Sequence, residues 1–226
     1  MNPFKKNKTI YLIRHGEIIY PLDEKNTKLI YGSDVSLDPL GRLQIQELAK
    51  KLQEEHAVPD VFAVSPFKRT QESAEILQDI LGVPFYSVSN LRDIDPNSWE
   101  GYPLNELDQF EGDVYSHPRS ANQETLEHLV KRAKKALEAI VSDNPGKRIG
   151  IISHGDLLSA IVWILKHQET PSSYKEMKNN FYLNKGQAYE CVVDEGLRMR
   201  GNGRFINVSE LNEGIEGFRH LPAKKS

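Results

Sequence analysis

Several side chains with reactive or charged groups follow directly after short apolar runs of the sequence. They are Arg14 and His15, Lys68 and Arg69, Asp93, and His154. Guanidinium groups and protonated imidazoles bind phosphate oxygens, and an unprotonated imidazole nitrogen is a nucleophile toward phosphorus. A carboxyl group can protonate a leaving alkoxide and then, as a carboxylate, accept a proton from water. These residue types together indicate phosphoryl transfer.

The apolar runs themselves have the composition of β-strands. Strands are predicted at Thr9 to Ile13, Val61 to Val64, Phe85 to Val88 and Ile149 to Ile152. They are rich in β-branched and aromatic residues, and the first is apolar at successive positions, as a central strand covered on both faces would be.

Helical patterns alternate with these strands. Asp38 and Pro39 supply an N-cap and a first-turn proline for a helix that runs to about Glu55, with its apolar stripe at Leu40, Leu43, Leu48 and Leu52. Further helices are predicted from about Arg69 to Gly82, from about Glu124 to Ser142, and from Gly155 to near Lys166.

Alternating strands and helices of these lengths predict an α/β fold, a three-layer α/β/α sandwich with a mostly parallel sheet. Ala188 to Val193 and Leu197 to Met199 form a plausible hairpin, with Phe205 to Val208 at the sheet edge, so this edge is expected to be antiparallel. In such sheets ligands bind beyond the carboxyl ends of the strands, where the reactive residues fall. We expect one domain over residues 1–226, with an irregular insertion at about 91–121 over the active site.

The composition excludes several other classes of protein. A net charge of −3 gives no reason to expect nucleic acid or anionic lipid as a partner. The apolar runs at 10–13 and 157–165 are too short to cross a membrane. Cys191 is the lone cysteine, which excludes an intramolecular disulfide and a cysteine-based zinc site. We therefore expect a cytoplasmic protein without metal or cofactor, and a homodimer is left open.

Four short motifs occur in a characteristic order. They are Arg14-His15-Gly16-Glu17, then Ser65-Pro66-Phe67-Lys68-Arg69-Thr70, then Leu91-Arg92-Asp93-Ile94-Asp95 followed by Trp99-Glu100-Gly101, and finally Ser153-His154-Gly155. An Arg-His-Gly tripeptide alone is a weak signal, but four motifs in order are a strong one. Over about residues 9–165 the chain resembles the histidine phosphatase superfamily, which has the phosphoglycerate-mutase-like fold.

The resemblance implies a role for each matching residue. His15 would carry the phosphoryl group as a phosphohistidine, Arg14, Arg69 and His154 would bind that group, and Asp93 would donate the proton. The implied activity is hydrolysis of the phosphomonoester of a small metabolite. Glutamate is commoner than aspartate at the position of Asp93, which leaves open whether Asp93 acts directly, through water, or yields this role to Asp95.

A second departure from the family pattern follows Gly16. Many members have Thr or Ser and then a phosphate-binding Asn, whereas this chain has Ile18-Ile19-Tyr20-Pro21 and additional residues up to about 31. A phosphoglycerate-type mutase and a catalytically weak phospholigand-binding regulatory module remain alternatives. The compact span from Asp93 to His154, with Gln123-Glu124-Thr125 resembling the Gly-Glu-Ser of phosphatases, favours hydrolysis.

Overall fold

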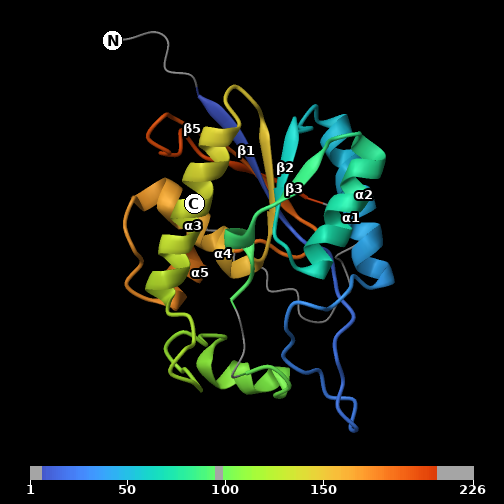
Figure 1. Ribbon diagram of the computed structural model, residues 1–226, viewed down its shortest axis with the longest axis vertical. Coiled ribbons are helices and arrows are strands. Elements are labelled where there is room, and N and C mark those ends of the chain that lie inside the picture. Colours follow the sequence, from blue (N-terminus) through green and yellow to red (C-terminus); the bar gives the residue numbers. More distant parts are fainter. Residues whose placement is uncertain (1–6, 95–98, 208–226) are drawn as a thin grey trace, which may run out of the picture.

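A six-stranded sheet forms the centre of the computed structural model, which describes residues 7–94 and 99–207 (Figure 1). The strands are β1 (Lys8–Arg14), β2 (Val61–Val64), β3 (Phe85–Ser87), β4 (Ile149–Ser153), β5 (Ala188–Val193) and β6 (Arg204–Ile206). Their order across the sheet is β3-β2-β4-β1-β5-β6. The first four pair in parallel, and β5 pairs antiparallel with both β1 and β6. The predicted mostly parallel sheet with an antiparallel edge is confirmed.

Helices cover both faces of this sheet. They are α1 (Pro39–Glu54) and α2 (Lys68–Leu81) on one face, and α3 (Leu126–Asp143), α4 (Gly155–His167) and α5 (Tyr174–Asn180) on the other (Figure 1). Successive side chains of a strand point to opposite faces. Accordingly Tyr11 and Ile13 pack in the core with α1 and α2, whereas Ile10 and Leu12 pack in the core with α3 and α4. The three-layer α/β/α architecture is therefore confirmed.

Local signals in the sequence set several helix ends. The Asp38 carboxylate accepts a hydrogen bond of 2.6 Å from the amide of Gly41, and Pro39 is the first residue of α1. Gly82 ends α2 in the left-handed conformation, with φ of 68°, which a residue without Cβ adopts readily. Thr125 caps α3, so this helix begins at Leu126 rather than at the predicted Glu124.

The buried face of α1 differs from the predicted stripe. Leu43 is 40% exposed, whereas Ile45 and Ala49 are fully buried beside Leu48 and Leu52. The sequence pattern counted every leucine as core, but the spacing of Ile45, Leu48, Ala49 and Leu52 describes a single helical face that excludes Leu43.

The C-terminal part of the sheet also differs from the prediction. The edge strand is Arg204–Ile206, shorter than the predicted 205–208, and Val208 lies outside the described residues. The predicted hairpin partner at 197–199 is reduced to a bridge between Met199 and Val193. The short helix α5 had no counterpart in the prediction, because its seven residues are mostly polar.

Two 3-10 helices lie at the start of the predicted irregular segment and within it. These are η1 (Ser89–Leu91) and η2 (Leu104–Phe110), and the remaining described residues from 99 to 121 form turns and bends with one isolated bridge. Within the described residues, no helix combines the length and the apolar character that a membrane span requires.

Candidate active site

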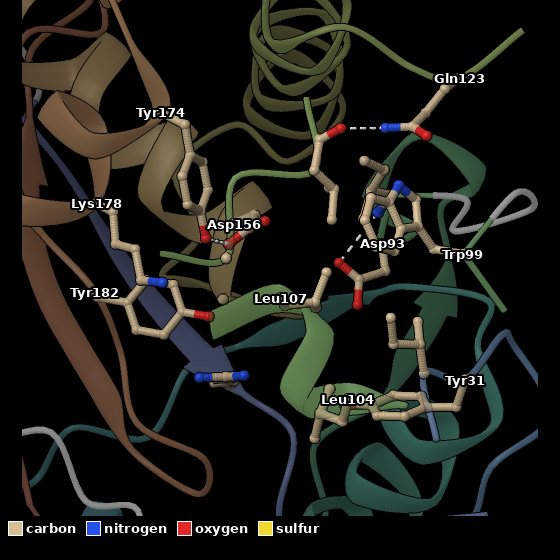
Figure 2. Close-up of a pocket in the computed structure, with 16 residues that line it drawn as sticks. Tyr31, Asp93, Trp99, Leu104, Leu107, Gln123, Asp156, Tyr174, Lys178 and Tyr182 are labelled. Carbon is tan, nitrogen blue, oxygen red and sulfur yellow. Dashed lines mark hydrogen bonds between the residues drawn. The ribbon is translucent and has the colours of Figure 1, made fainter. Parts of the chain in front are cut away.

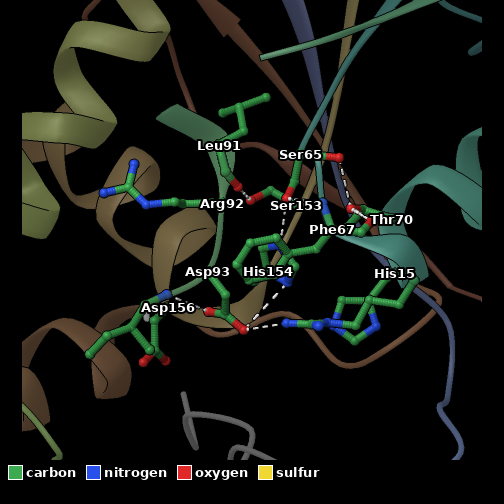
Figure 3. A network of polar contacts seen from close by, with 12 residues as sticks. His15, Ser65, Phe67, Thr70, Leu91, Arg92, Asp93, Ser153, His154 and Asp156 are labelled. Atoms are coloured by element: carbon green, nitrogen blue, oxygen red, sulfur yellow. Dashed lines mark hydrogen bonds and ion pairs between the residues drawn. The ribbon is translucent and has the colours of Figure 1, made fainter. Parts of the chain in front are cut away.

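Two histidines come together because they follow adjacent strands. β1 and β4 pair in parallel, with Arg14 opposite Ser153, so His15 and His154 leave the sheet at the same edge. Their ring centroids are 5.3 Å apart (Figure 3). β2 lies on the other side of β4, and the helix that follows it brings Arg69 to the same edge. Lys68, in contrast, is exposed and pairs with Asp34 at 3.4 Å.

The His15 ring is buried and held in a defined orientation. Its exposed fraction is 1%, and Nδ1 lies 2.7 Å from the carbonyl oxygen of Gly16. Because a carbonyl only accepts hydrogen bonds, Nδ1 carries the proton and Nε2 carries the lone pair. Burial lowers the pKa of His15 well below its usual value, and the positive charge of Arg69 lowers it further. The imidazole is therefore neutral and nucleophilic at Nε2.

Two glycines allow the turn that carries His15 to lie on α1. A Cβ on Gly16 would collide with the backbone of Gly41, and a Cβ on Gly41 would collide with the backbone of Glu17. The turn therefore contacts the first turn of α1 backbone to backbone. This contact fixes the position of the His15 ring relative to the sheet.

Two arginines flank the histidines. Arg14 donates through Nη1 to the carbonyl of Leu183 at 2.8 Å and lies over the Tyr182 ring, 5.0 Å from its centroid. Arg69 is 1% exposed and donates through Nη1 to the carbonyl of Gly32 at 2.9 Å. Within the described residues, the buried Nε atoms of both arginines have no hydrogen-bond partner. Such oriented donors suit the oxygens of an anion.

Asp93 lies against both a guanidinium and an imidazole. Its Oδ2 is 2.9 Å from Nη2 of Arg69 and 3.4 Å from Nδ1 of His154, and its Oδ1 accepts from the amide of Ile94 (Figure 3). The carboxylate is 24% exposed, so solvent reaches it. The alternative proton donor, Asp95, lies outside the described residues.

The backbone before Asp93 is anchored from two sides. The Ser153 hydroxyl donates to the carbonyl of Leu91 at 2.7 Å. Arg132 of α3 donates to the carbonyls of Asn90 and Arg92 at 2.9 and 2.7 Å. The carboxylate of Glu124 accepts two further hydrogen bonds from the same guanidinium, each of 2.7 Å. The Gln123-Glu124-Thr125 motif thus acts on Asp93 through Arg132, a connection that sequence reasoning missed.

His154 is positioned by a serine of the second motif. Its Nε2 lies 2.8 Å from Oγ of Ser65, and its Nδ1 faces Asp93. Burial lowers the pKa of His154 well below its usual value, and Arg69 and Arg14 lower it further. The second imidazole is therefore also neutral in the resting site.

A pocket of about 230 Å³ opens beside Arg14 and Asp93 (Figure 2). Its apolar wall consists of Ile30, Ile94, Trp99, Leu104, Leu107 and Val114. Its polar wall includes Tyr31, Gln123, Asp156, Tyr174, Lys178 and Tyr182. Asp156 and Tyr182 were not among the predicted site residues, and the surroundings of Tyr182 carry no motif. The position of Asp156, two residues after His154, was the available signal.

The segment that departs from the family pattern after Gly16 contacts a largely buried lysine. Lys185 contacts the Glu17 carboxylate at 2.5 Å and the Tyr20 hydroxyl at 2.6 Å. Burial lowers the pKa of Lys185 to about 8, although Glu17 acts in the opposite direction. The Nζ atom of Lys28 lies over the ring of Tyr20, 4.7 Å from the ring centroid. The altered loop therefore contacts Lys185, whose positive charge also acts on His15.

The predicted site residues Arg14, His15, Arg69, Asp93 and His154 thus share one edge of the sheet. Among residues 7–94 and 99–207, no three or more His, Cys, Asp or Glu side chains are grouped as metal ligands would be. The arrangement can bind a tetrahedral anion with guanidinium groups, attack it with an imidazole nitrogen, and exchange a proton through a carboxyl group.

Comparisons with known proteins agree with this arrangement. The family model described as histidine phosphatase superfamily (branch 1) matches residues 10–187. An uncharacterized phosphatase PhoE from Bacillus subtilis is 28% identical over 154 residues, which are 68% of this chain and 75% of that protein. A putative phosphoserine phosphatase 2 from Hydrogenobacter thermophilus is 29% identical and covers 70% of this chain and 78% of its own. The solved structure of YhfR from Bacillus stearothermophilus superimposes with a TM-score of 0.68 at 25% identity, covering 85% of this chain and 94% of that one.

Proposed function

Because the chain belongs to the histidine phosphatase superfamily (branch 1) and is a phosphatase, we propose that His15 is the nucleophile of a metal-independent phosphomonoesterase. The observation that carries this proposal is the contact of 2.7 Å between Nδ1 of His15 and the carbonyl of Gly16. This contact leaves the lone pair on Nε2. The positive charges of two guanidinium groups in the same site attract a phosphate ester.

In the first step, Nε2 of His15 attacks phosphorus and the bond between phosphorus and the ester oxygen breaks. The carboxyl group of Asp93 gives its proton to the leaving oxygen, so the alcohol departs neutral. Arg14, Arg69 and His154 hold the phosphoryl oxygens while negative charge moves onto them. The product of this step is a phosphohistidine on His15 and an ionised Asp93.

In the second step, water replaces the alcohol. The Asp93 carboxylate accepts a proton from the water as its oxygen attacks phosphorus, and the bond between phosphorus and Nε2 breaks. Inorganic phosphate leaves, His15 returns to its neutral form, and Asp93 is again protonated. The partial exposure of Asp93 supports access of water to this position.

The substrate that we propose is the phosphomonoester of a small metabolite. The pocket volume of about 230 Å³ lies below the ~300–1,000 Å³ of sites for drug-sized ligands, which favours a small alcohol. The site residues all lie at or beyond the carboxyl ends of strands of one sheet, which supports a single domain. We further propose an enzyme without nucleic-acid partners, for which the net charge of −3 is the support. We also propose that it is cytoplasmic, for which the lone cysteine is the support.

The test is release of phosphate from an aryl phosphate in the presence of a chelator, followed by capture of the intermediate. We expect His15→Ala to abolish release. The second step is slowed in Asp93→Asn, so a quench of this variant in alkaline denaturant should give one acid-labile phosphate per chain on His15. Full activity of His15→Ala, or activity without any such adduct, would refute the covalent mechanism. Incubation with 3-phosphoglycerate separates the mutase alternative, because a mutase forms 2-phosphoglycerate faster than it frees phosphate.

A further inference from the structure

A second carboxylate, Asp156, lies in the pocket and takes no part in the steps above. It is in the first turn of α4, two residues after His154, and it lines the pocket beside Arg14 and Asp93. The hydroxyl of Tyr174 donates to its Oδ1 at 3.1 Å (Figure 2). The hydroxyl of Tyr115 donates to its Oδ2 at 2.9 Å. Two tyrosines from different segments therefore hold this carboxylate in one orientation.

The carboxylate keeps capacity for a ligand. A carboxylate has about four acceptor positions, and the two tyrosine hydroxyls occupy one on each oxygen of Asp156. Burial raises the pKa of Asp156, and the nearby charge of Asp93 adds to this rise. Asp156 is half-buried, so water is partly excluded from it and a further donor stabilises it more than it would at the surface.

A cation lies next to this acceptor. Lys178 lines the same pocket, and its Nζ lies 5.1 and 5.3 Å from the ring centroids of Tyr174 and Tyr182. A carboxylate acceptor and an ammonium donor close together suit neighbouring hydroxyl groups, because each hydroxyl both donates and accepts a hydrogen bond. The apolar side chains of Leu104 and Leu107 form the facing wall, where they can cover a carbon skeleton.

From these contacts we propose that Asp156 is the residue that selects a phosphorylated polyol or sugar as the substrate. It accepts a hydrogen bond from a hydroxyl group of the alcohol and rejects alcohols that carry a carboxylate at that position. Asp156 faces the pocket, so a further carboxylate beside it would meet a like charge. This inference rests on the proposed function, since it assumes that the phosphoryl group lies against His15 and the alcohol extends into the pocket.

The test uses two substrates that differ at one carbon. In sn-glycerol 1-phosphate that carbon is a hydroxymethyl group, and in 3-phospho-D-glycerate, which has the same arrangement at its secondary carbon, it is a carboxylate. Both have alkoxide leaving groups, so the ratio of their kcat/KM values is insensitive to loss of a proton donor. We expect the ratio for the wild-type enzyme to favour glycerol phosphate by about tenfold or more. An aryl phosphate is assayed in parallel as the test of phosphatase activity itself.

The variant Asp156→Asn should lower this ratio by about tenfold, because the amide removes the repelling charge and part of the acceptor capacity. Tyr174→Phe keeps the ring and removes one donor to Asp156, so it should lower the ratio to a smaller extent. This variant replaces Asp156→Asn as the test if Asp156→Asn does not fold. Glu138→Gln changes an exposed carboxylate of α3 and should leave the ratio at the wild-type value.

Each outcome bears on one proposal. A wild-type ratio that favours 3-phosphoglycerate, with aryl phosphate hydrolysed, would overturn the inference and leave the phosphatase intact. Equal losses on both alkyl substrates in Asp156→Asn would also overturn it and would identify Asp156 as a proton donor. Failure to release phosphate from the aryl phosphate and from both alkyl substrates would instead refute the proposed function.

Discussion

The carboxylate of Asp93 forms an ion pair with the buried guanidinium of Arg69, with 2.9 Å between Oδ2 and Nη2. The proposed proton donor therefore contacts a group that the proposed mechanism assigns to the phosphoryl oxygens. Phosphate and Asp93 must share the positive charge of Arg69, and two negative groups on one cation oppose each other. Binding of a phosphate ester therefore opposes the ion pair between Asp93 and Arg69.

The variant Asp93→Asn should separate binding from turnover. We expect inorganic phosphate to inhibit this variant more tightly, by several-fold, because the competing charge is gone. At the same time kcat for an alkyl phosphate should fall about 10²- to 10⁴-fold, because the amide transfers no proton. The measurements are the inhibition constant of phosphate and kcat, with Asp79→Asn, an exposed aspartate of α2, as the control. Weaker binding of phosphate to Asp93→Asn would contradict this account of the ion pair.

Arg132 is expected to act on catalysis through the backbone before Asp93. Arg132→Met removes the donors to the carbonyls of Asn90 and Arg92 and leaves Glu124 without its partner. A displaced Asp93 should lower kcat about 10- to 100-fold for an alkyl phosphate. The loss should be smaller for p-nitrophenyl phosphate, whose leaving group departs without a proton.

The matched control is Lys131→Met, which changes the adjacent, exposed cation that pairs with Glu127. Its kinetics should match those of the wild-type enzyme. Equal losses of Arg132→Met on alkyl and aryl substrates would show that Arg132 supports the site in general rather than the proton donor.

The stability of the protein should fall as the pH drops below about 6.5. His15 and His154 have lowered pKa values in the folded state, whereas in the unfolded chain they titrate near ~6.5. Below that pH the unfolded state binds protons that the folded state does not, so the free energy of unfolding decreases until the pH reaches the folded-state pKa values. Each imidazole can lower the free energy of unfolding by at most about 1.4 kcal/mol per pH unit.

Urea unfolding at pH 5, 6, 7 and 8 measures this slope. His154→Asn removes one of the two groups, so its free energy of unfolding should decline less steeply between pH 6.5 and 5 than that of the wild-type protein. An identical slope in the two proteins would mean that His154 binds its proton as readily in the folded state as in the unfolded chain.

Gly155 should be intolerant of a side chain. A Cβ at this position would lie 2.5 Å from the Tyr182 hydroxyl and 3.1 Å from Cζ of Arg14. Gly155→Ala should therefore displace both groups, lower kcat/KM by about 10- to 100-fold and destabilise the fold by about 1–3 kcal/mol, although alanine normally favours a helix.

Gly196→Ala provides the comparison, because a Cβ there makes only ordinary contact with Asp194 at 3.4 Å. Its kcat/KM and its midpoint of urea unfolding should stay close to those of the wild-type protein. If Gly155→Ala behaved in the same way, Arg14 and Tyr182 would not need their present positions for activity.

Features coded by local patterns were predictable from the sequence. The bounds of β2 are those expected, since four apolar residues lie between turn signals. Asp38 with Pro39 and Gly82 mark the ends of α1 and α2 because capping depends on neighbouring residues alone. The placement of reactive residues after strands followed from parallel topology, which brings the carboxyl ends of the strands to one edge.

Features that depend on long-range contacts were not predictable. The link from Glu124 through Arg132 to the backbone at Arg92 spans helix and loop, and no spacing rule describes it. Asp156 resembles an ordinary first-turn carboxylate until Tyr115 and Tyr174 are seen on it. The short helix that carries Tyr174 is set by packing against α4, where Tyr174 and Met177 are buried, rather than by its own periodicity.

The pairing of β1 with β4 sets Ile13 opposite Ile152 and Arg14 opposite Ser153. A slip of this ladder by a single residue would carry His154 about 3.3 Å along the strand direction and turn its ring toward the other side of the sheet. The main-chain hydrogen bonds between β1 and β4 in the core therefore set the distance between the imidazoles of His15 and His154. Insertions or deletions inside either strand should abolish turnover even where the protein still folds, whereas changes of length in surface connections remote from this edge should be tolerated.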